Sequence, residues 1–125
     1  MRRAAMVMTW VLVIVIAAGL IPAGASKLAG KSATRWRERF LKWGYPTKTV
    51  IVVGVAELAC AIGLLISKTR MAAAIGVIVL MTGAFGTHLL NGEVRRIIPP
   101  LVLGGAAVAI VVLARGRSLS TNSSG

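Results

Sequence analysis

The sequence has little charge, and least of all acidic charge. Only 14% of its 125 residues are charged, whereas a soluble domain usually carries about 25%. Three acidic residues stand against 15 lysines and arginines, for a formal net charge of +12. Hydrophobic residues make up 57% of the chain, more than one small water-soluble core can hide. The composition therefore excludes an ordinary soluble domain and indicates a membrane protein.

Residues that build redox and metal centres are equally scarce. Cys60 is the single cysteine, so the chain can form neither an internal disulfide nor a CxxC dithiol. His88 is the single histidine, and the spacing of potential ligands matches no standard set, so we expect no metal site. The sequence also lacks a Gly-rich phosphate loop and a nucleophile elbow. These absences favour a protein that is not an enzyme on its own.

Long apolar runs are present instead, at residues 4–26, 49–67, 71–92 and 97–114. Each is close to the roughly 20 residues that a helix needs to cross the hydrocarbon core of a bilayer. None alternates with a period of two, so we expect helices and not barrel strands. Very short connections between the last three runs make neighbouring helices antiparallel. The sequence thus predicts an all-α integral membrane protein with a four-transmembrane-helix, up-and-down bundle.

The predicted bundle forms a single domain over residues 1–117, and a flexible polar tail follows at residues 118–125. With four spans, both termini lie on the same side. Lysines and arginines cluster at the ends of the apolar runs, where they meet lipid headgroups, so we expect the bilayer and not nucleic acid as the partner. One alternative stays open, because MRRAAM, the apolar run and Ala23-Gly24-Ala25 also fit a cleaved signal peptide, which would leave three spans.

The long connection after the first span carries an amphipathic pattern. Trp36, Phe40 and Trp43 recur at i, i+4 and i+7, which makes one apolar stripe on a helix with a basic stripe beside it. Gly44 and Pro46 then end the pattern. A short basic helix with tryptophans suits the plane of the headgroups. We therefore predict a short interfacial amphipathic helix between the first and second spans, with these three aromatic residues as its anchor, acting as a surface anchor or a lid. The alternative is an irregular loop.

One acidic residue, Glu57, lies inside the second apolar run. An ionised carboxylate in hydrocarbon is costly, so it needs a partner or a proton. Lys27 ends the first run and His88 lies near the end of the third, which places all three on the same side of the membrane. We predict that Lys27, Glu57 and His88 form a buried polar constellation around a pocket, with Glu57 bonded to Lys27 or His88, or protonated. A purely structural polar clamp is the alternative.

Four segments of the chain resemble the DoxX family of small four-helix membrane proteins, in particular its DoxX-like branch. The segments are GASKLAG, RFLKWGYP, VGVAELACAIGLLI and AAAIGVIVLMTGAFGTHLLNGE. The resemblance extends over about residues 18–112. Its most specific pieces are Lys27-Leu28, Gly54-x-x-Glu57-Leu58, Gly63-Leu64-Leu65 and Gly83-Ala84-x-x-Thr87-His88.

The resemblance implies the fold more firmly than the function. Members of that family are similar to the small subunit of a thiosulfate:quinone oxidoreductase and to a membrane partner in a thiol-stress complex. This implies an accessory or membrane subunit of a quinone- or thiol-linked redox complex, multi-pass in the bacterial inner membrane, with a soluble oxidoreductase as its partner. No resident cofactor is expected, a quinone near Glu57 is the candidate ligand, and an oligomer is compatible with the pattern.

Two other functions remain open. A small proton-coupled exporter resembling the small multidrug-resistance transporters would use the buried carboxylate of Glu57, although those transporters carry their essential Glu in the first helix. An assembly or chaperone-like membrane protein would act by helix contacts without catalysis.

Overall fold

The computed structural model describes the backbone of residues 2–124 and the side chains of residues 2–116. Its elements in chain order are α1 (Arg2–Leu28), α2 (Gly30–Lys42), α3 (Lys48–Leu65), α4 (Arg70–Leu90), the 3-10 helix η1 (Val94–Ile97) and α5 (Ile98–Ser124). Helices α1, α3 and α4, and the stretch from η1 into α5, are long and apolar enough to span a membrane. The chain is therefore an all-α, multi-pass membrane protein, as predicted. The tail predicted at residues 118–125 lies outside the residues whose side chains are described.

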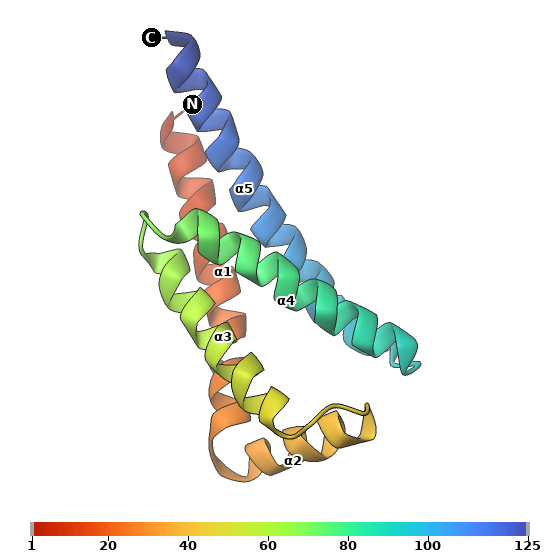
Figure 1. Ribbon diagram of the computed structural model, residues 1–125. Coiled ribbons are helices and arrows are strands. Elements are labelled where there is room, and N and C mark those ends of the chain that lie inside the picture. Colours follow the sequence, from red (N-terminus) through yellow and green to blue (C-terminus); the bar gives the residue numbers. More distant parts are fainter. Residues whose placement is uncertain (1, 125) are drawn as a thin grey trace.

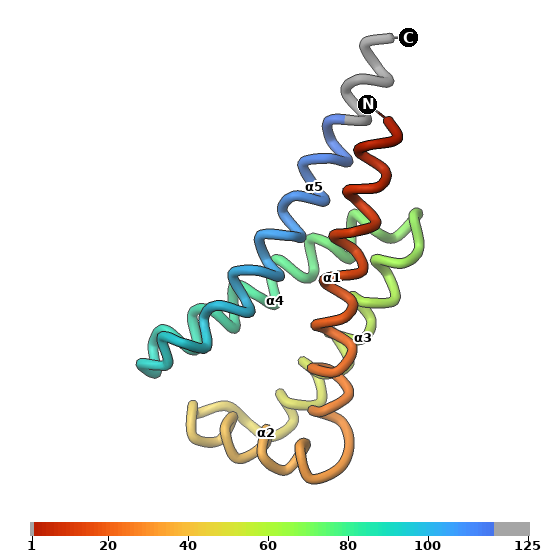
Figure 2. The backbone as a smooth tube through the Cα atoms, turned by 180° about the vertical axis from the view of Figure 1, so that it is seen from behind, coloured from red at the N-terminus to blue at the C-terminus, as the bar shows by residue number. Residues whose placement is uncertain are grey.

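The four long helices are arranged in the ring order α1, α3, α4, α5. Helix α1 packs against α3 and α5, and α4 packs against α3 and α5, while α2 lies on α1 and α3. Figure 1 shows the N-terminal end of α1 close to the C-terminal end of α5, and the view from behind in Figure 2 agrees. At the other end, α4 and α5 diverge from α1 and α3, so the bundle opens towards α2.

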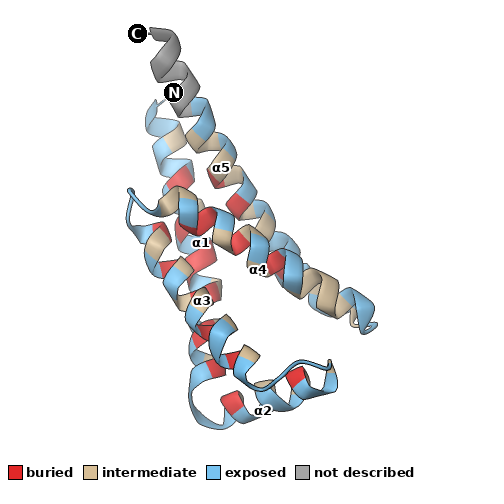
Figure 3. Cartoon of the chain, in the orientation of Figure 1, coloured by how far each residue is buried: buried red, intermediate tan, exposed pale blue. Residues whose placement is uncertain are grey.

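The core lies where the four long helices meet. Its fully buried members come from all four of them: Val13, Ile16, Leu20, Ala61, Leu64, Ala74, Val77, Ala107 and Ile110. In Figure 3 the buried colouring falls where the long helices face one another, and the exposed colouring covers most of their outer sides. Many of the outward residues are valine, isoleucine or leucine. Lipid tails are as apolar as these side chains, so such outer faces suit contact with the bilayer.

Two helices end in the same glycine-dependent turn. After α2, Gly44 has a φ of 90°, and the N–H of Tyr45 donates to a carbonyl in the last turn of α2 at 2.8 Å. After α4, Gly92 has a φ of 72°, and the N–H of Glu93 donates to the carbonyl of His88 at 2.8 Å. This is the Schellman geometry, in which the positive φ favours glycine. The two turns carry Tyr45 and Glu93 back towards the helix that each has just left.

Candidate functional site

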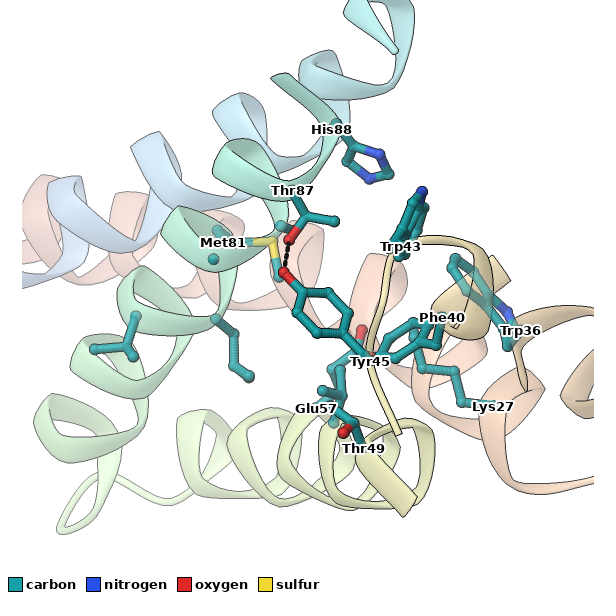
Figure 4. Close-up of a pocket in the computed structure, with 15 residues that line it drawn as sticks. Lys27, Trp36, Phe40, Trp43, Tyr45, Thr49, Glu57, Met81, Thr87 and His88 are labelled. Atoms are coloured by element: carbon teal, nitrogen blue, oxygen red, sulfur yellow. Dashed lines mark hydrogen bonds and ion pairs between the residues drawn. The ribbon is translucent and has the colours of Figure 1, made fainter. Parts of the chain in front are cut away.

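A cavity of about 300 Å³ lies in the part of the bundle that opens towards α2. Its walls come from the end of α1, the aromatic stripe of α2, the first half of α3 and the second half of α4. Figure 4 shows the labelled side chains converging on it from these four helices and from the turn that holds Tyr45. The walls are largely apolar and aromatic, with a few polar groups. Cavities of this size and character are typical of sites for small ligands.

Two glycines allow the helices beside the cavity to approach closely. A Cβ added to Gly24 of α1 would lie 2.8 Å from the carbonyl oxygen of Gly54 in α3, and a Cβ on Gly54 would lie 3.1 Å from the carbonyl oxygen of Gly24. Lys27 and Glu57 stand three residues further along their helices, on the same faces as the glycines. The close approach brings Lys27 Nζ to 2.7 Å from Glu57 Oε1.

The Lys27–Glu57 pair is almost wholly enclosed, with 6% and 4% of the two residues exposed. Lys27 Nζ also donates to the carbonyl of Ala23 at 3.3 Å and lies 4.1 Å from the ring centroid of Trp36. An unpaired charge here would lack solvation, whereas each partner compensates the other. Of the two partners predicted for Glu57, the structure therefore shows Lys27.

The aromatic stripe of α2 faces the cavity (Figure 4). Trp36 is held on two sides, because its Nε1–H donates to Ser26 Oγ at 3.1 Å while Lys27 lies over its ring. Phe40 is buried, with the ring centroids of Trp43 and Tyr45 at 5.3 Å and 5.9 Å. The amphipathic helix itself is present where the sequence placed it. The anchoring of Trp36, Phe40 and Trp43 in the membrane interface stays a prediction.

His88 lines the same cavity but belongs to a different pair. Its Nδ1 lies 3.0 Å from Glu93 Oε1, and Trp43 meets the ring edge-on at a centroid distance of 5.4 Å. The hydrogen bond from His88 holds the pKa of the Glu93 carboxyl below its usual range, and the positive charge of Arg96, 3.4 Å from Glu93 Oε2, acts in the same direction. The structure does not pair His88 with Glu57.

Another contact joins the two walls of the cavity beside His88. The hydroxyl of Tyr45 lies 2.8 Å from Thr87 Oγ1, a hydrogen bond between the turn after α2 and the last turns of α4 (Figure 4). Together with the Trp43–His88 contact, it links the α2 end of the cavity to α4. Within the described residues, α2 itself makes no backbone approach to α4. These side-chain contacts therefore bridge the α2 and α4 walls of the cavity.

The three predicted polar residues thus line one cavity, where Lys27 pairs with Glu57 and His88 pairs with a fourth residue, Glu93. Reasoning from the sequence did not join Glu93 to His88, and it gave Tyr45 no place at the site. A usable signal was present in both cases. Each residue follows a glycine that ends a helix, and the Schellman motif turns the next residue back towards that helix.

The lone thiol has a packing position. A Cβ added to Gly76 of α4 would lie 2.9 Å from Cys60 Sγ, so the thiol fills the close contact between α3 and α4. Cys60 is not among the residues that line the cavity. Within the described part of the chain, no three His, Cys, Asp or Glu residues gather in a way that could hold a metal ion.

Comparison with known proteins gives one match. The family model described as the DoxX-like family matches residues 11–112, which is most of the chain and includes every residue that lines the cavity. No curated protein and no solved structure matches the chain.

Proposed function

Since this chain belongs to the DoxX-like family, we propose that it is an accessory membrane subunit of a quinone- or thiol-linked redox complex in the bacterial inner membrane. In this proposal the cavity holds a quinone-sized, membrane-soluble ligand. A soluble oxidoreductase carries out the chemistry, and the membrane subunit binds and positions the ligand.

The observation that supports this function best is the cavity itself. Its walls are largely apolar and aromatic, and its charged or titratable groups stand at two places, the Lys27–Glu57 pair at one and His88, bonded to Glu93 outside the lining, at the other. A quinone is a neutral ring with polar oxygens on opposite sides, which suits apolar walls with polar groups at separate places. Such a ligand dissolves in the bilayer, and the cavity lies in a bundle whose outer faces are apolar.

The Lys27–Glu57 pair favours ligand binding over proton-coupled export. An exporter of that kind must release a proton from its carboxylate and take it up again in each cycle. Lys27 Nζ lies 2.7 Å from Glu57 Oε1, so the carboxylate is already engaged by a buried partner on the wall of the cavity. A carboxylate that is held in an ion pair suits a wall of a binding site better than a proton carrier.

The ligand part of the proposal is tested with a variant that fills the cavity. Gly83 lines it, and an added Cβ meets nothing within 4 Å, so Gly83→Leu adds bulk at the cavity wall from a position with room for its first atom. Gly86→Leu is the matched control, because Gly86 lies on the same helix with equally open surroundings and does not line the cavity. We expect a short-chain benzoquinone to quench the fluorescence of Trp36 and Trp43 in the wild type and in Gly86→Leu. Gly83→Leu is expected to lose at least about tenfold in affinity.

The partner part is tested by purifying the tagged chain from native membranes and identifying the proteins that accompany it. A soluble oxidoreductase that co-purifies with the wild type supports the proposal. Substrate-dependent proton movement in vesicles, with no quinone binding, would instead support the exporter. If the chain neither binds a quinone nor co-purifies with an oxidoreductase, the results would favour an assembly or chaperone-like function.

A further inference from the structure

We infer that His88, oriented by Glu93, offers its second ring nitrogen to the cavity as a hydrogen-bond acceptor, so that the cavity selects a ligand with a hydroxyl donor. In the chemistry of the proposed ligand class, this means a quinol in preference to the quinone. The inference rests on the proposed function, because it specifies the ligand of the same cavity. Glu93 is then a positioning residue, since it acts on the ligand through His88.

The first step concerns which nitrogen of His88 carries the proton. Nδ1 lies 3.0 Å from Glu93 Oε1, and an ionised carboxylate can only accept hydrogen bonds. The ionised form of Glu93 is favoured, because its pKa is held low by His88 and by the nearby positive charge of Arg96. Nδ1–H is therefore the donor. In a neutral imidazole, Nε2 then carries the lone pair and accepts a hydrogen bond.

The second step concerns where that lone pair is available. His88 lines the cavity, and within the described part of the chain no group hydrogen-bonds to its Nε2. The ring is constrained on two sides, by Glu93 at Nδ1 and by the edge-on ring of Trp43 at an interplanar angle of 89°. A histidine that is oriented by a carboxylate through one nitrogen presents the other in a defined direction, as at many metal and catalytic sites.

The third step explains why Glu93 is in place. Gly92 has a φ of 72°, and the turn that it allows bonds the N–H of Glu93 to the carbonyl of His88. The backbone and the side chain of Glu93 therefore both bond to His88. Arg96 Nη1, 3.4 Å from Glu93 Oε2, holds the other carboxylate oxygen. The contacts among His88, Glu93 and Arg96 all lie at the end of α4, so they depend on the local turn more than on the packing of the bundle.

The test compares two probes that differ in donor capacity and little in shape, a short-chain benzoquinol and its dimethyl ether. Both are titrated into the purified full-length chain in detergent by isothermal calorimetry. A ligand hydroxyl that bonds to Nε2 makes the quinol bind about 5- to 10-fold more tightly than the ether. His88→Phe keeps an aromatic ring without an acceptor, so it should bind both probes with similar affinity.

Glu93→Gln separates the positioning role from a merely structural one. A glutamine amide can donate to Nδ1 as well as accept from it, so Nε2 is no longer held as an acceptor. We expect the preference for the quinol to fall below about twofold while the ether binds as in the wild type. Glu38→Gln, an exposed acid on α2, is the control and should keep the full preference. A Glu93→Gln variant that keeps the full preference overturns the inference.

The outcomes distinguish the two proposals. Equal affinities for quinol and ether in the wild type overturn the hydroxyl selection and leave the cavity as a ligand site. Binding of neither probe, together with no effect of Gly83→Leu on quinone binding, overturns the proposed ligand function and with it the inference. Should Glu93→Gln fail to fold, the ratio of affinities in His88→Phe decides, because a preference that persists without the imidazole contradicts the assignment.

Discussion

Gly24 and Gly54 face each other where α1 crosses α3: a methyl group added to Gly24 would clash with the carbonyl oxygen of Gly54 at 2.8 Å, and one added to Gly54 would lie tightly against that of Gly24 at 3.1 Å. Lys27 and Glu57 each lie three residues after their glycine in these antiparallel helices, on either side of the crossing, and their side chains meet there. Larger residues at these two positions would push the helix backbones further apart, whereas the close crossing lets Lys27 Nζ reach Glu57 Oε1 at 2.7 Å. A packing contact thus makes an electrostatic one possible.

Gly24→Ala should lower the melting temperature of the detergent-solubilised protein. The new Cβ would lie 2.8 Å from a backbone oxygen that cannot rotate away, so the helices must separate, at a cost of about 1–3 kcal/mol. Gly86→Ala is the matched control, because its Cβ meets nothing within 4 Å and alanine favours the helix. Equal melting temperatures for the two variants would show that the crossing tolerates a wider spacing.

Lys27→Met should be among the most destabilising single changes in the chain. It leaves the carboxylate of Glu57 buried without compensation, and breaking a buried pair in this way costs about 3–5 kcal/mol. Adding Glu57→Gln to Lys27→Met removes the stranded charge and should restore much of the loss. Thermal unfolding of the wild type, both single variants and the double variant measures the coupling. If the two effects simply add, the residues do not act as a pair.

Glu57→Gln alone should be milder than Glu57→Ala. The amide oxygen of glutamine can still accept a hydrogen bond from Lys27. Lys27 Nζ also donates to the carbonyl of Ala23 and lies over the ring of Trp36. Alanine removes the acceptor and leaves a buried donor poorly satisfied, at about 1–3 kcal/mol. Melting temperatures and the quinone titration check both variants. Two variants that match the wild type in both measurements would show that Glu57 contributes neither to the fold nor to the cavity.

The His88–Glu93 pair predicts a specific dependence of stability on pH. The folded state lowers the pKa of Glu93 from its ordinary value of 4.5, so the pair contributes stability that is fully present above that value. The contribution is lost as the pH falls through the lower pKa of the folded state. As the pH falls below 4.5, the melting temperature of the wild type should therefore drop by an amount that is absent in Glu93→Gln, which lacks the carboxylate. Parallel curves for the two proteins would argue against the pair.

The topology predicts that both termini lie on the same side of the membrane. Reporter fusions after Gly125, compared with tags placed before Met1, test this directly. Helix α1 supplies Val13, Ile16 and Leu20 to the core, so the four-helix bundle needs this segment. Termini on opposite sides, or loss of an N-terminal tag by cleavage after Ala25, would contradict the bundle described above.

The sequence alone determined the membrane class, the four spans and the amphipathic helix. Each of these depends on properties that are local to a segment. A run of about 20 apolar residues spans a bilayer whatever its neighbours do, and the i, i+4, i+7 spacing of Trp36, Phe40 and Trp43 makes a stripe on any helix. Depth along the spans also placed Lys27, Glu57 and His88 at one end of the bundle, because the rise per residue of a helix is constant.

Only the tertiary structure decided which of these groups meet. Partner choice depends on how each helix is rotated and how closely it crosses the next, and a sequence rich in glycine and alanine offers many crossings that look equivalent. The close crossing at Gly24 and Gly54 brings Lys27 within reach of Glu57. The turn at Gly92 places Glu93 beside His88. The stripe of α2 faces the cavity because α4 and α5 diverge from α1 and α3 there, and no pattern within a single segment encodes that divergence.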